Sequence, residues 1–434
     1  MTGIGHYMGH RVRFAAVALT VLALTACQGT SGTPPTMPGN TTTASPHPTG
    51  TGGTSPSVSG SSTSNWPRTT RGAQVAVDGR DYTTLYTVDP HGSAGARVGA
   101  LRIRADGSAV IVNSPAPGPG EFLTQSQVGI QTGQSRAWLP AQTGSRPRQA
   151  IVAAARGQSL VWLETKSTDL FYQDWKVYAA RVDQRRPVLL GDSFDLAKTD
   201  EVPPPPGVSY LTTDGVHAWW TMTYRTKSQP MGWGARIMVR DLGGREPLST
   251  AVDRAKLPAA TAGGVAYVRS RDVDPDMAAT RYEIRLRQGV TDTLVTAGQL
   301  VTDGQVTAMC ASDTVLAWAV RPAWPLSDSP PEHSTGGRLN VMNLATKAQH
   351  VVELDDDAGA LDLGCGDTFV AWGNGSGNGD PGQYVVDVPS GKLWKLGESP
   401  GISGVYAAGT MLGWTLPPKA QEAAPIRVTK WHRP

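Results

Sequence analysis

The sequence predicts an all-β protein, a β-propeller of four-stranded blades, from one pattern that recurs between residue 150 and the C-terminus. In its clearest copy, residues 306–320 (VTAMCASDTVLAWAV), two short apolar runs flank a Ser-Asp turn and the second run contains a tryptophan. An aromatic residue returns in this place every 42 to 57 residues, which is close to the length of a propeller blade. No long helical periodicity interrupts the pattern.

Residues 1–26 are typical of a lipoprotein signal peptide. A basic start with Arg11 and Arg13 precedes an apolar run at 14–24. A helix needs about 20 apolar residues to cross a bilayer, so this run is too short to span one, but it fits the core of a signal peptide. The motif LTAC, which follows and ends at Cys27, resembles the lipobox of bacterial lipoproteins.

The lipobox resemblance implies cleavage before Cys27 and attachment of acyl chains to that residue. Each methylene that enters the bilayer contributes about 0.8 kcal/mol, so several chains would hold a soluble domain on the membrane. We therefore expect an extracytoplasmic protein that is lipid-anchored to the cell membrane, in an envelope with either a cell wall or an outer membrane. The alternative is an ordinary secretory signal with a chance cysteine.

Residues 27–67 predict a disordered linker behind the anchor. Between Gln28 and Pro67 there is no Lys, Arg, Asp or Glu, and Thr, Ser, Gly and Pro dominate. Such a segment has too little apolar surface to bury and fold. A flexible chain of about 40 residues has an average reach of roughly 35 Å, which would lift the following domain away from the membrane surface.

The composition argues against nucleic-acid binding. The 434 residues include 39 Lys and Arg against 36 Asp and Glu, for a formal net charge of +3. Proteins that bind nucleic acid concentrate positive charge in a patch or stripe, and no such run occurs here. The 50 glycines and 33 prolines fit a linker followed by a turn-rich domain. We expect this domain to be a monomer.

Residues 68–434 make up the propeller domain, in which each copy of the repeat predicts one blade. A small apolar strand is followed by a tight turn, a strand centred on an aromatic residue, a loop, an alternating third strand and, in five copies, a fourth strand. Gly and Asp in the tight turns suit the positive φ of two-residue hairpin loops. The aromatic residues of the second strands are Trp162, Trp219, Tyr267, Trp318, Trp372 and Trp414.

The third strands end in a characteristic way, with VRDLGG at 239–244 and VDVPSG at 386–391. This pattern resembles the TolB-like and WD40-like propeller families, in which a third strand ends in Asp-Leu before a glycine-containing turn. The resemblance covers residues 150–434 well and residues 70–150 poorly. It implies the fold and leaves the function open, because propellers carry many unrelated functions.

The last copy of the repeat ends after its third strand, at residues 426–431, although a closed ring needs a fourth. An N-terminal strand at 74–77 or at 83–88 would supply it and remove an open sheet edge. Residues 98–139 then remain for one additional blade. The prediction is therefore seven blades, with six or eight as alternatives. The even spacing of so many similar hairpins argues against a two-sheet sandwich.

Two cysteines remain if Cys27 carries the lipid. Cys310 and Cys365 hold equivalent places, eight and seven residues before Trp318 and Trp372. Equivalent positions in consecutive blades should be neighbours in space, and an exported protein meets an oxidising compartment. We predict a disulfide between Cys310 and Cys365; the alternative is two buried, unpaired thiols.

The sharpest local motif is an acidic stretch in which Asp272, Asp274 and Asp276 alternate and Glu283 stands at position twelve. This spacing resembles a calcium-binding loop, in which hard oxygen ligands converge on one ion. The motif departs from that family because Met277 replaces the usual glycine and no helices flank it. A Ca²⁺ site at these four residues is one hypothesis, and a solvated acidic loop is the simpler interpretation.

No catalytic motif is present, neither G-x-S-x-G nor a P-loop nor H-E-x-x-H. Asp362 is the only carboxylate expected on an innermost strand, where propeller enzymes usually carry their acids. We therefore expect a binding or scaffold module for an envelope protein or a wall glycan, without a required cofactor. The alternative is a hydrolase or lyase that acts on glycan or peptide, with a site formed from propeller loops.

Overall fold

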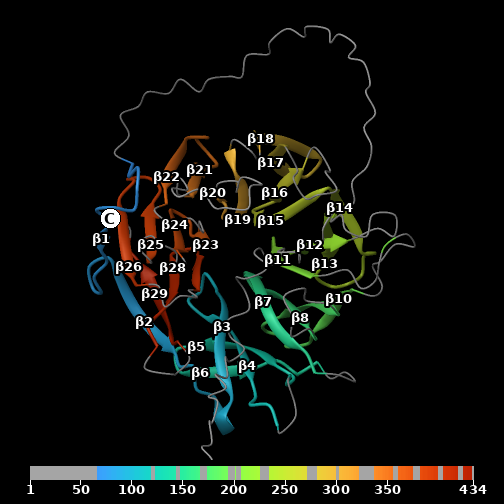
Figure 1. Cartoon of the computed structure of the whole chain (residues 1–434). Helices are drawn as coiled ribbons and strands as arrows, with labels where there is room; N and C mark the ends of the chain where they lie inside the picture. Colours follow the sequence, from blue (N-terminus) through green and yellow to red (C-terminus); the bar gives the residue numbers. More distant parts are fainter. Residues whose placement is uncertain are drawn as a thin grey trace, which may run out of the picture.

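The computed structural model describes residues 66–118, 123–142, 147–166, 174–193, 201, 207–224, 234–270, 281–299, 303–321, 337–354, 360–374, 382–398, 404–418 and 424–432. Within these residues the chain forms seven sheets arranged around a common axis (Figure 1). The predicted signal peptide, Cys27 and the linker up to residue 65 lie outside the described part. No helix in the described ranges is long and apolar enough to span a bilayer.

Each sheet is one blade. In six of the seven blades, the chain enters at the innermost strand and leaves at the outermost strand. Blade 1 consists of β3 (Arg97–Ile103), β4 (Ala109–Ser114), β5 (Gln127–Thr132) and β6 (Ser135–Trp138). Blade 2 consists of β7 (Gln149–Arg156), β8 (Ser159–Thr165), β9 (Trp175–Arg181) and β10 (Val188–Asp192). Blade 3 consists of β11 (Gly207–Thr213), β12 (His217–Tyr224), β13 (Gly234–Asp241) and β14 (Ser249–Asp253). A short 3-10 helix, η1 (Ser93–Gly95), precedes blade 1.

The remaining blades follow the same antiparallel order. Blade 4 consists of β15 (Ala255–Thr261), β16 (Gly264–Ser270), β17 (Arg281–Gln288) and β18 (Thr291–Gln299). Blade 5 consists of β19 (Gln305–Ala311), β20 (Val315–Arg321), β21 (Arg338–Asn343) and β22 (Gln349–Glu353). Blade 6 consists of β23 (Ala360–Cys365), β24 (Phe369–Asn374), β25 (Gln383–Asp387) and β26 (Leu393–Gly397). Blade 7 combines β27 (Val405–Ala408), β28 (Met411–Thr415) and β29 (Ile426–Trp431) with the N-terminal strand β2 (Tyr82–Val88).

The ring is closed by the N-terminal strand, as the sequence predicts. β2 pairs antiparallel with β29, from Tyr82 opposite Trp431 to Val88 opposite Ile426. The second of the two candidate segments, 83–88, is therefore the closing strand. The first candidate forms β1 (Gln74–Val75), which instead adds to blade 6 parallel to β26. Residues 97–138 form the additional blade, so the count of seven is confirmed.

The inner strands of neighbouring blades contact one another all the way round, and β27 contacts β3. Hydrogen bonds link every pair of neighbouring blades close to the axis. They run from Arg104 Nη2 to Gly157 O at 2.7 Å, Ser159 Oγ to Gly215 O at 3.0 Å, Ala260 N to Thr212 Oγ1 at 3.2 Å, Ala262 N to Asp313 Oδ1 at 2.6 Å, Thr314 Oγ1 to Asp367 O, Asp367 N to Gly409 O at 2.8 Å, and Tyr406 OH to Ala100 O at 2.9 Å.

The hydrophobic core lies between the blades, because both faces of each sheet pack on a neighbour. This explains why the second strands are nearly continuous in their burial; every residue of β8 is buried. Five of the six predicted aromatic residues are buried to 2% exposure or less; they are Trp162, Tyr267, Trp318, Trp372 and Trp414.

The sixth aromatic residue, Trp219, lies in the second strand of its blade as predicted, but it does not occupy the fully buried position. Its neighbour Trp220 is the fully buried tryptophan of blade 3 and pairs with Leu211 on the inner strand, as Trp318 pairs with Met309 in blade 5. Trp219 is only partly buried and packs beside Ile237 and Val252. Consecutive strand residues point to opposite faces, so a Trp-Trp pair places one ring in each interface, and the sequence does not say which ring takes the larger space.

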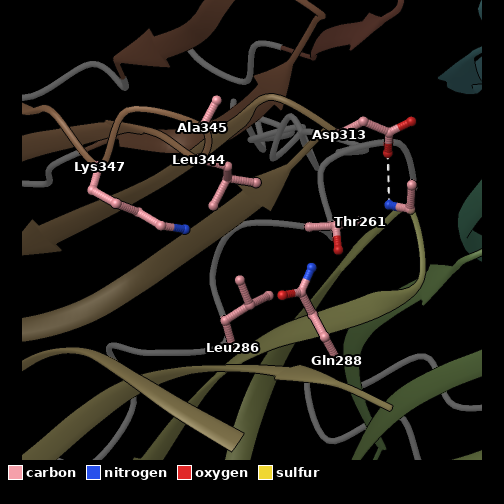
Figure 2. A pocket seen from close by; sticks show the side chains of 8 residues that line it. Thr261, Leu286, Gln288, Asp313, Leu344, Ala345 and Lys347 are labelled. Atoms are coloured by element: carbon pink, nitrogen blue, oxygen red, sulfur yellow. Dashed lines mark hydrogen bonds between the residues drawn. The ribbon is translucent and has the colours of Figure 1, made fainter. Parts of the chain in front are cut away.

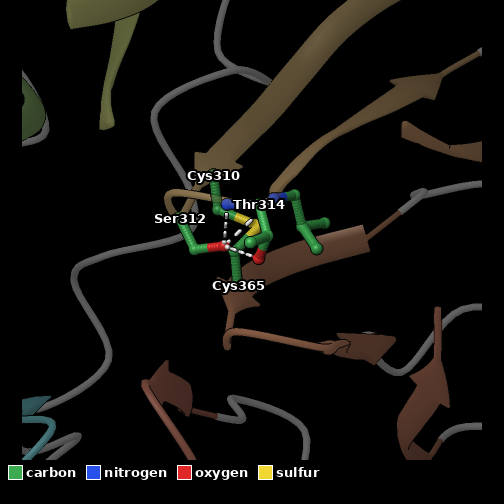
Figure 3. Close-up of a disulfide and its surroundings, with 5 residues drawn as sticks. Cys310, Ser312, Thr314 and Cys365 are labelled. Carbon is green, nitrogen blue, oxygen red and sulfur yellow. Dashed lines mark hydrogen bonds between the residues drawn. A yellow bond between two sulfur atoms is a disulfide. The ribbon is translucent and has the colours of Figure 1, made fainter. Parts of the chain in front are cut away.

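The predicted disulfide is present in the structure (Figure 3). Cys310 at the end of β19 and Cys365 at the end of β23 are joined with 5.6 Å between their Cα atoms. Both residues are buried, at 5% and 3% exposure. The bond therefore connects the inner strands of blades 5 and 6, near the tight turns that follow these strands.

Residues 66–81, which we call the strap, connect the linker to the closing strand. Trp66 stacks on His350 of blade 5, and the Arg68 carbonyl accepts a hydrogen bond of 2.7 Å from the Glu353 amide. Farther along, β1 pairs with the outermost strand of blade 6 before the chain enters blade 7. The strap thus covers parts of two exposed sheet edges, which would otherwise be open to pairing with other chains.

Candidate functional site

Four ionisable side chains lie on the inner strands among mostly small or apolar residues, and we call them the axial cluster. They are Arg102 on β3, Lys256 on β15, Asp362 on β23 and Tyr406 on β27. Three of these strands, β23, β27 and β3, are consecutive in the ring. β15 of blade 4 lies three blades from β3 of blade 1. Ring closure therefore brings Tyr406 near Asp362 and Arg102, with whose charges it interacts, whereas Lys256 faces the axis from a blade farther round the ring.

The burial along the inner strands indicates that these positions face the axis, most clearly on β27, where buried and partly exposed residues alternate. On β27, Val405 and Ala407 are buried between blades, and Tyr406 between them keeps partial exposure. Arg102, Lys256 and Asp362 are likewise partly exposed. Since alternate strand residues point to opposite sides, the buried set packs on neighbouring blades and the other set reaches solvent along the axis.

Irregular pairing within the inner strands helps to aim these side chains. The register of β3 with β4 shifts between Ala100 and Arg102, and that of β23 with β24 shifts between Ala360 and Asp362. In blade 4 the shift begins directly after Lys256. An extra residue of this kind bends a strand and redirects the neighbouring side chain. The inner strands of blades 2, 3 and 5 have similar shifts, so the irregularity is a feature of the fold that these side chains use.

A glycine allows two of these strands to approach closely. A Cβ atom at Gly364 on β23 would lie 2.7 Å from the backbone nitrogen of Ala407 on β27. Any larger residue at this position would push β23 and β27 apart. Asp362 and Tyr406, which stand next to this contact on the same two strands, are therefore held close together by the packing.

The surrounding protein perturbs the ionisation of all four groups. Burial raises the pKa of Asp362 to about 7. Burial, and then the charge of Asp362, raise the pKa of Tyr406. Burial lowers the pKa of Arg102 and that of Lys256. Each charged form is thus disfavoured by loss of water, which is the pattern expected where a protein prepares charges for a ligand or a proton transfer.

Three of the four groups lack a protein partner in the part of the chain that the structure describes. Neither a hydrogen bond nor an ion pair reaches the Arg102 guanidinium, the Lys256 ammonium or the Asp362 carboxylate there. By contrast, the buried Arg236 is held by Glu201 through two hydrogen bonds of 2.6 and 2.9 Å. The fold therefore gives the buried Arg236 a counter-ion, whereas the three axial charges have none within the described residues.

One end of the axis is bridged by an ion pair. Arg156, at the end of β7 in blade 2, pairs with Asp313, in the turn between β19 and β20 of blade 5. Its side chain passes Gly215 of blade 3, and Asp313 also accepts a hydrogen bond from the Ala262 amide of blade 4 (Figure 2). The contact therefore joins four blades at the face that carries the tight turns.

A small pocket of about 220 Å³ lies beside this bridge, between the turns of blades 4 and 5 (Figure 2). It is lined by Thr261, Ala262, Leu286, Gln288, Asp313, Leu344, Ala345 and Lys347. Asp313 is already engaged by Arg156 and Ala262. The pocket is a surface hollow between two hairpins and holds no set of unpaired charges comparable to the axial cluster.

The structure brings together only part of what the sequence predicts for the site. Asp362 lies where it was expected, on an innermost strand. Glu283, the twelfth residue of the proposed calcium loop, is buried on β17 with its Oε2 2.9 Å from Arg285 Nη1. Asp272, Asp274 and Asp276 lie outside the described residues, so the calcium site stays a prediction. Within the described ranges, no group of three or more His, Cys, Asp or Glu side chains could hold a metal ion.

Sequence reasoning missed Arg102, Lys256 and Tyr406. Lys256 lies one residue before the predicted inner strand 257–261, Arg102 belongs to the blade that matches the repeat poorly, and Tyr406 occupies a strand position that resembles the core. A charged residue within a strand of small apolar residues is the signal that could have found two of them. Their convergence depends on the ring.

Comparison with solved structures identifies the fold. The chain is similar to the Pyrococcus horikoshii acylaminoacyl peptidase, with a TM-score of 0.50 and 11% identity over 78% of this chain and 51% of that one. It also resembles the β-propeller domain of the Trilobed protease from Pyrococcus furiosus, a domain with an open velcro topology, with a TM-score of 0.49 and 9% identity over 77% of this chain and 93% of that one.

An oligogalacturonate lyase in complex with manganese gives a TM-score of 0.45 at 9% identity, over 81% of this chain and 96% of the other. This chain spans about half the length of the acylaminoacyl peptidase. No protein family model matches the chain, and no curated protein matches it significantly. At these identities the likeness concerns the fold alone: the chain is a seven-bladed β-propeller similar to the propeller domains of peptidases and proteases.

Proposed function

We propose that this protein is an extracytoplasmic binding module that is anchored to the membrane through a lipid on Cys27 and binds an envelope ligand at the axial cluster. The observation that carries the proposal is the cluster itself. Arg102, Lys256 and Asp362 are charged, partly desolvated and without partners in the described ranges. An unpaired charge in such a place is costly, and binding of a ligand accounts for its presence.

The anchor rests on the sequence at Cys27, which resembles a lipobox, and the strap supports the proposed arrangement. Trp66 fixes the start of the propeller domain to the outer edge of blade 5. A linker of about 40 residues with an average reach of roughly 35 Å would then suspend the ring from that edge. From the endings of its third strands, we also propose that the propeller is related to the TolB-like or WD40-like families.

Binding is favoured over glycoside hydrolysis by the number of carboxylates. Hydrolysis of a glycosidic bond generally needs two carboxyl groups that face each other across the bond. Among the inner strands as far as the structure describes them, Asp362 is the only residue with a carboxylate side chain. A site with two cations and one acid is better suited to holding a charged ligand.

An extracytoplasmic lyase or hydrolase is the second candidate, and one observation favours it. The pKa of Asp362 is raised to about 7, which is close to the value that suits a general acid or base at neutral pH. Tyr406 lies close enough for its pKa to respond to the charge of Asp362. In this version Asp362 would transfer the proton and Arg102 would hold an anionic group of the substrate.

Two experiments test the two halves of the proposal. Metabolic labelling with a palmitate analogue should mark the wild-type protein and place it in the membrane fraction, whereas Cys27→Ser should be unlabelled and released. Ser59→Ala, in the linker, is the matched control and should behave as the wild type. Labelling that persists in Cys27→Ser would contradict the anchor.

Ligand binding is tested by crosslinking intact cells and purifying the tagged protein. An envelope component should copurify with the wild type and with the surface control Arg245→Gln/Lys392→Gln. It should be lost from Arg102→Gln/Lys256→Gln. Equal recovery with both double variants would show that the axial cluster is not the binding site. Turnover of a glycan or peptide that Asp362→Asn abolishes would favour the enzymatic candidate.

A further inference from the structure

We propose that the small pocket between the tight turns of blades 4 and 5 binds a carboxylate group on a short aliphatic chain. The groups that hold the carboxylate are the side chains of Lys347, Gln288 and Thr261, and the apolar contacts to the chain are Leu286 and Leu344. The pocket is separate from the axial cluster, so the inference goes beyond the proposed function and does not depend on it.

The two walls of the pocket come from neighbouring blades (Figure 2). Gln288 ends β17 of blade 4, and Lys347 lies in the turn between β21 and β22 of blade 5. Their side chains point into the pocket from opposite sides, with Leu286 and Leu344 between them (Figure 2). The site therefore depends on the packing of one blade against the next.

A glycine places the Gln288 side chain. Gly264 on β16 is the strand partner of Gln288, and a Cβ atom at Gly264 would lie 2.9 Å from Gln288 Cγ and 2.3 Å from the Arg287 carbonyl oxygen. Any larger residue would push this side chain and its strand aside. The Gln288 amide thus lies beside the pocket, and among the described residues no hydrogen bond engages it.

The available polar groups of the pocket can all donate hydrogen bonds. Thr261 is 2% exposed, and its Oγ1 has no hydrogen-bond partner. Within the described ranges, neither a hydrogen bond nor an ion pair reaches the Lys347 ammonium. A hydroxyl, an amide and an ammonium group match the two acceptor oxygens of a carboxylate. A buried hydroxyl without a partner is also costly, and a ligand oxygen would relieve that cost.

The charge of the pocket favours a monoanion. Asp313 is the only acidic residue that lines it, and Asp313 is already engaged by Arg156 and by the Ala262 amide at 2.6 Å. The charge of Lys347 is left uncompensated, so it attracts a negative group. One cation beside two leucines suits a singly charged acid with an apolar chain better than it suits a phosphate dianion.

The backbone of Lys347 points to a role for its side chain. Lys347 has a φ of 62°, and its amide donates to Asn343 O at 2.8 Å. The same turn of blade 6 has Gly391, with a φ of 68° and a bond of 2.8 Å to Asp387 O. Glycine adopts this left-handed conformation freely, whereas a Cβ atom makes it costly. Blade 2 has Arg185 in the equivalent place, which supplies a matched control.

The size of the pocket limits the ligand. Its volume is about 220 Å³, and a water molecule occupies about 30 Å³ in the liquid, so the space corresponds to roughly seven waters. Pockets for drug-sized ligands begin at about 300 Å³. The ligand group should therefore be a short-chain acid such as butyrate.

Saturation-transfer difference NMR on the detergent-purified full chain tests this inference, with detergent alone as the blank. Butyrate should bind saturably, with a dissociation constant on the order of 1 mM for so small a ligand. Butyramide, which has the same shape and no charge, should bind about fivefold more weakly or not at all. Inorganic phosphate at equal ionic strength should not displace butyrate.

A peptide probe distinguishes two sources of the carboxylate. Acetyl-glycyl-valine presents the group at the end of a chain. If it binds more tightly than butyrate, the carboxylate belongs to a peptide C-terminus; if it binds more weakly, the ligand is a free acid. Failure of butyrate and of the peptide to bind, or equal binding of butyramide or phosphate, would overturn the inference.

Substitutions locate the binding in the pocket. Lys347→Gly should weaken butyrate binding about fivefold or more, whereas Lys347→Arg, which keeps the charge, should retain most of it. Thr261→Val removes the hydroxyl at nearly constant shape and should also weaken binding. Arg185→Gly makes the same change in the equivalent turn of blade 2 and should leave binding unchanged. Binding that survives in Lys347→Gly would show that butyrate binds elsewhere and would overturn the inference.

Thermal unfolding distinguishes a ligand site from a structural role. Glycine relieves the left-handed strain in both turns, so Lys347→Gly and Arg185→Gly should melt close to the wild type. Thr261→Val should also do so, because no hydrogen bond of the free protein is lost. A substantial fall in melting temperature for both Lys347→Gly and Thr261→Val would assign the two side chains to the fold, and would overturn the inference.

Discussion

The indole ring of Trp66 stacks on the imidazole of His350, with 4.2 Å between the ring centroids and 3° between the ring planes. Trp66 is the first residue described, and His350 lies on the outermost strand of blade 5. The contact therefore fixes the point at which the N-terminal segment meets the ring. From there the strap runs along blade 6 and supplies the closing strand of blade 7.

Loss of this stack should loosen the strap. We expect Trp66→Ala to lower the free energy of unfolding by about 1–3 kcal/mol, from lost apolar burial and lost ring stacking. Hydrogen exchange should show faster exchange at residues 66–76, with little change in blade 2. His350→Phe, which preserves a stacking partner, is the control and should retain most of the stability; equal loss in both variants would argue against stacking as the cause.

The bond between Cys310 and Cys365 should stabilise the ring. It closes a loop with a sequence separation of 55 residues, and the chain-entropy estimate for such a loop is about 4 kcal/mol. Cys310→Ser/Cys365→Ser should therefore melt at a lower temperature than the wild type. Added reductant should lower the melting temperature of the wild type alone. A reductant effect of the same size in the double variant would assign it to something other than this bond.

Two adjacent tryptophans in blade 3 should contribute unequally to the free energy of unfolding. Trp220 is fully buried between blades, whereas Trp219 is partly exposed. Trp220→Ala should cost about 3–5 kcal/mol through loss of burial and creation of a cavity, and Trp219→Ala clearly less. Chemical denaturation of the two variants makes a matched comparison, because they differ by one position. A larger loss from Trp219→Ala would contradict the observed register.

The buried ion pair of Arg236 and Glu201 should be essential as a pair. Both side chains are 2% exposed, so removal of one residue takes a directly bonded counter-ion away from a buried charge. Glu201→Ala should destabilise the protein by about 3–5 kcal/mol. The double variant Arg236→Met/Glu201→Leu should be far closer to the wild type, because it removes both charges. Denaturation of single and double variants completes the cycle, and additive losses would indicate independent roles.

Asp362 should make stability depend on pH. Burial raises its pKa from an ordinary value of 3.8 to about 7, so the folded protein holds a proton that the unfolded chain releases at lower pH. Its contribution is therefore complete below about pH 4 and is lost as the pH rises through 7. Compared with the wild type, Asp362→Asn should gain relative stability between pH 4 and pH 8.

The same titration should affect the copurification of an anionic envelope ligand. Protonation of Asp362 removes the one negative charge of the axial cluster, so binding should be tighter at pH 5.5 than at pH 8. Across the neighbouring strands, the charge of Asp362 interacts with Tyr406, and Tyr406 interacts in turn with Arg102. In Asp362→Asn this dependence should be largely absent; an unchanged pH profile would show that another group titrates.

Much of the fold could be predicted from the sequence, because its signals are local. Hairpin turns with Gly or Asp and alternating strand residues need only a few neighbouring positions, and they recur often enough to define the blades. The need for an N-terminal closing strand, at 74–77 or 83–88, and the bond between Cys310 and Cys365 followed from the same repeat. In each case a missing strand or an equivalent position implied a partner, without knowledge of the contacts themselves.

What the sequence alone determined is the set of strands, their order and the ring that they form. Only the tertiary structure decided which side chains meet at the axis, since the bond from Tyr406 to Ala100 spans 306 residues and depends on closure of the ring. The choice of Trp220 over Trp219 and the aim of Arg102 and Asp362 depend on register and bulges. A shift of one residue reverses the side of the sheet that a side chain faces, and hydrophobic pattern does not reveal that shift where both faces are buried.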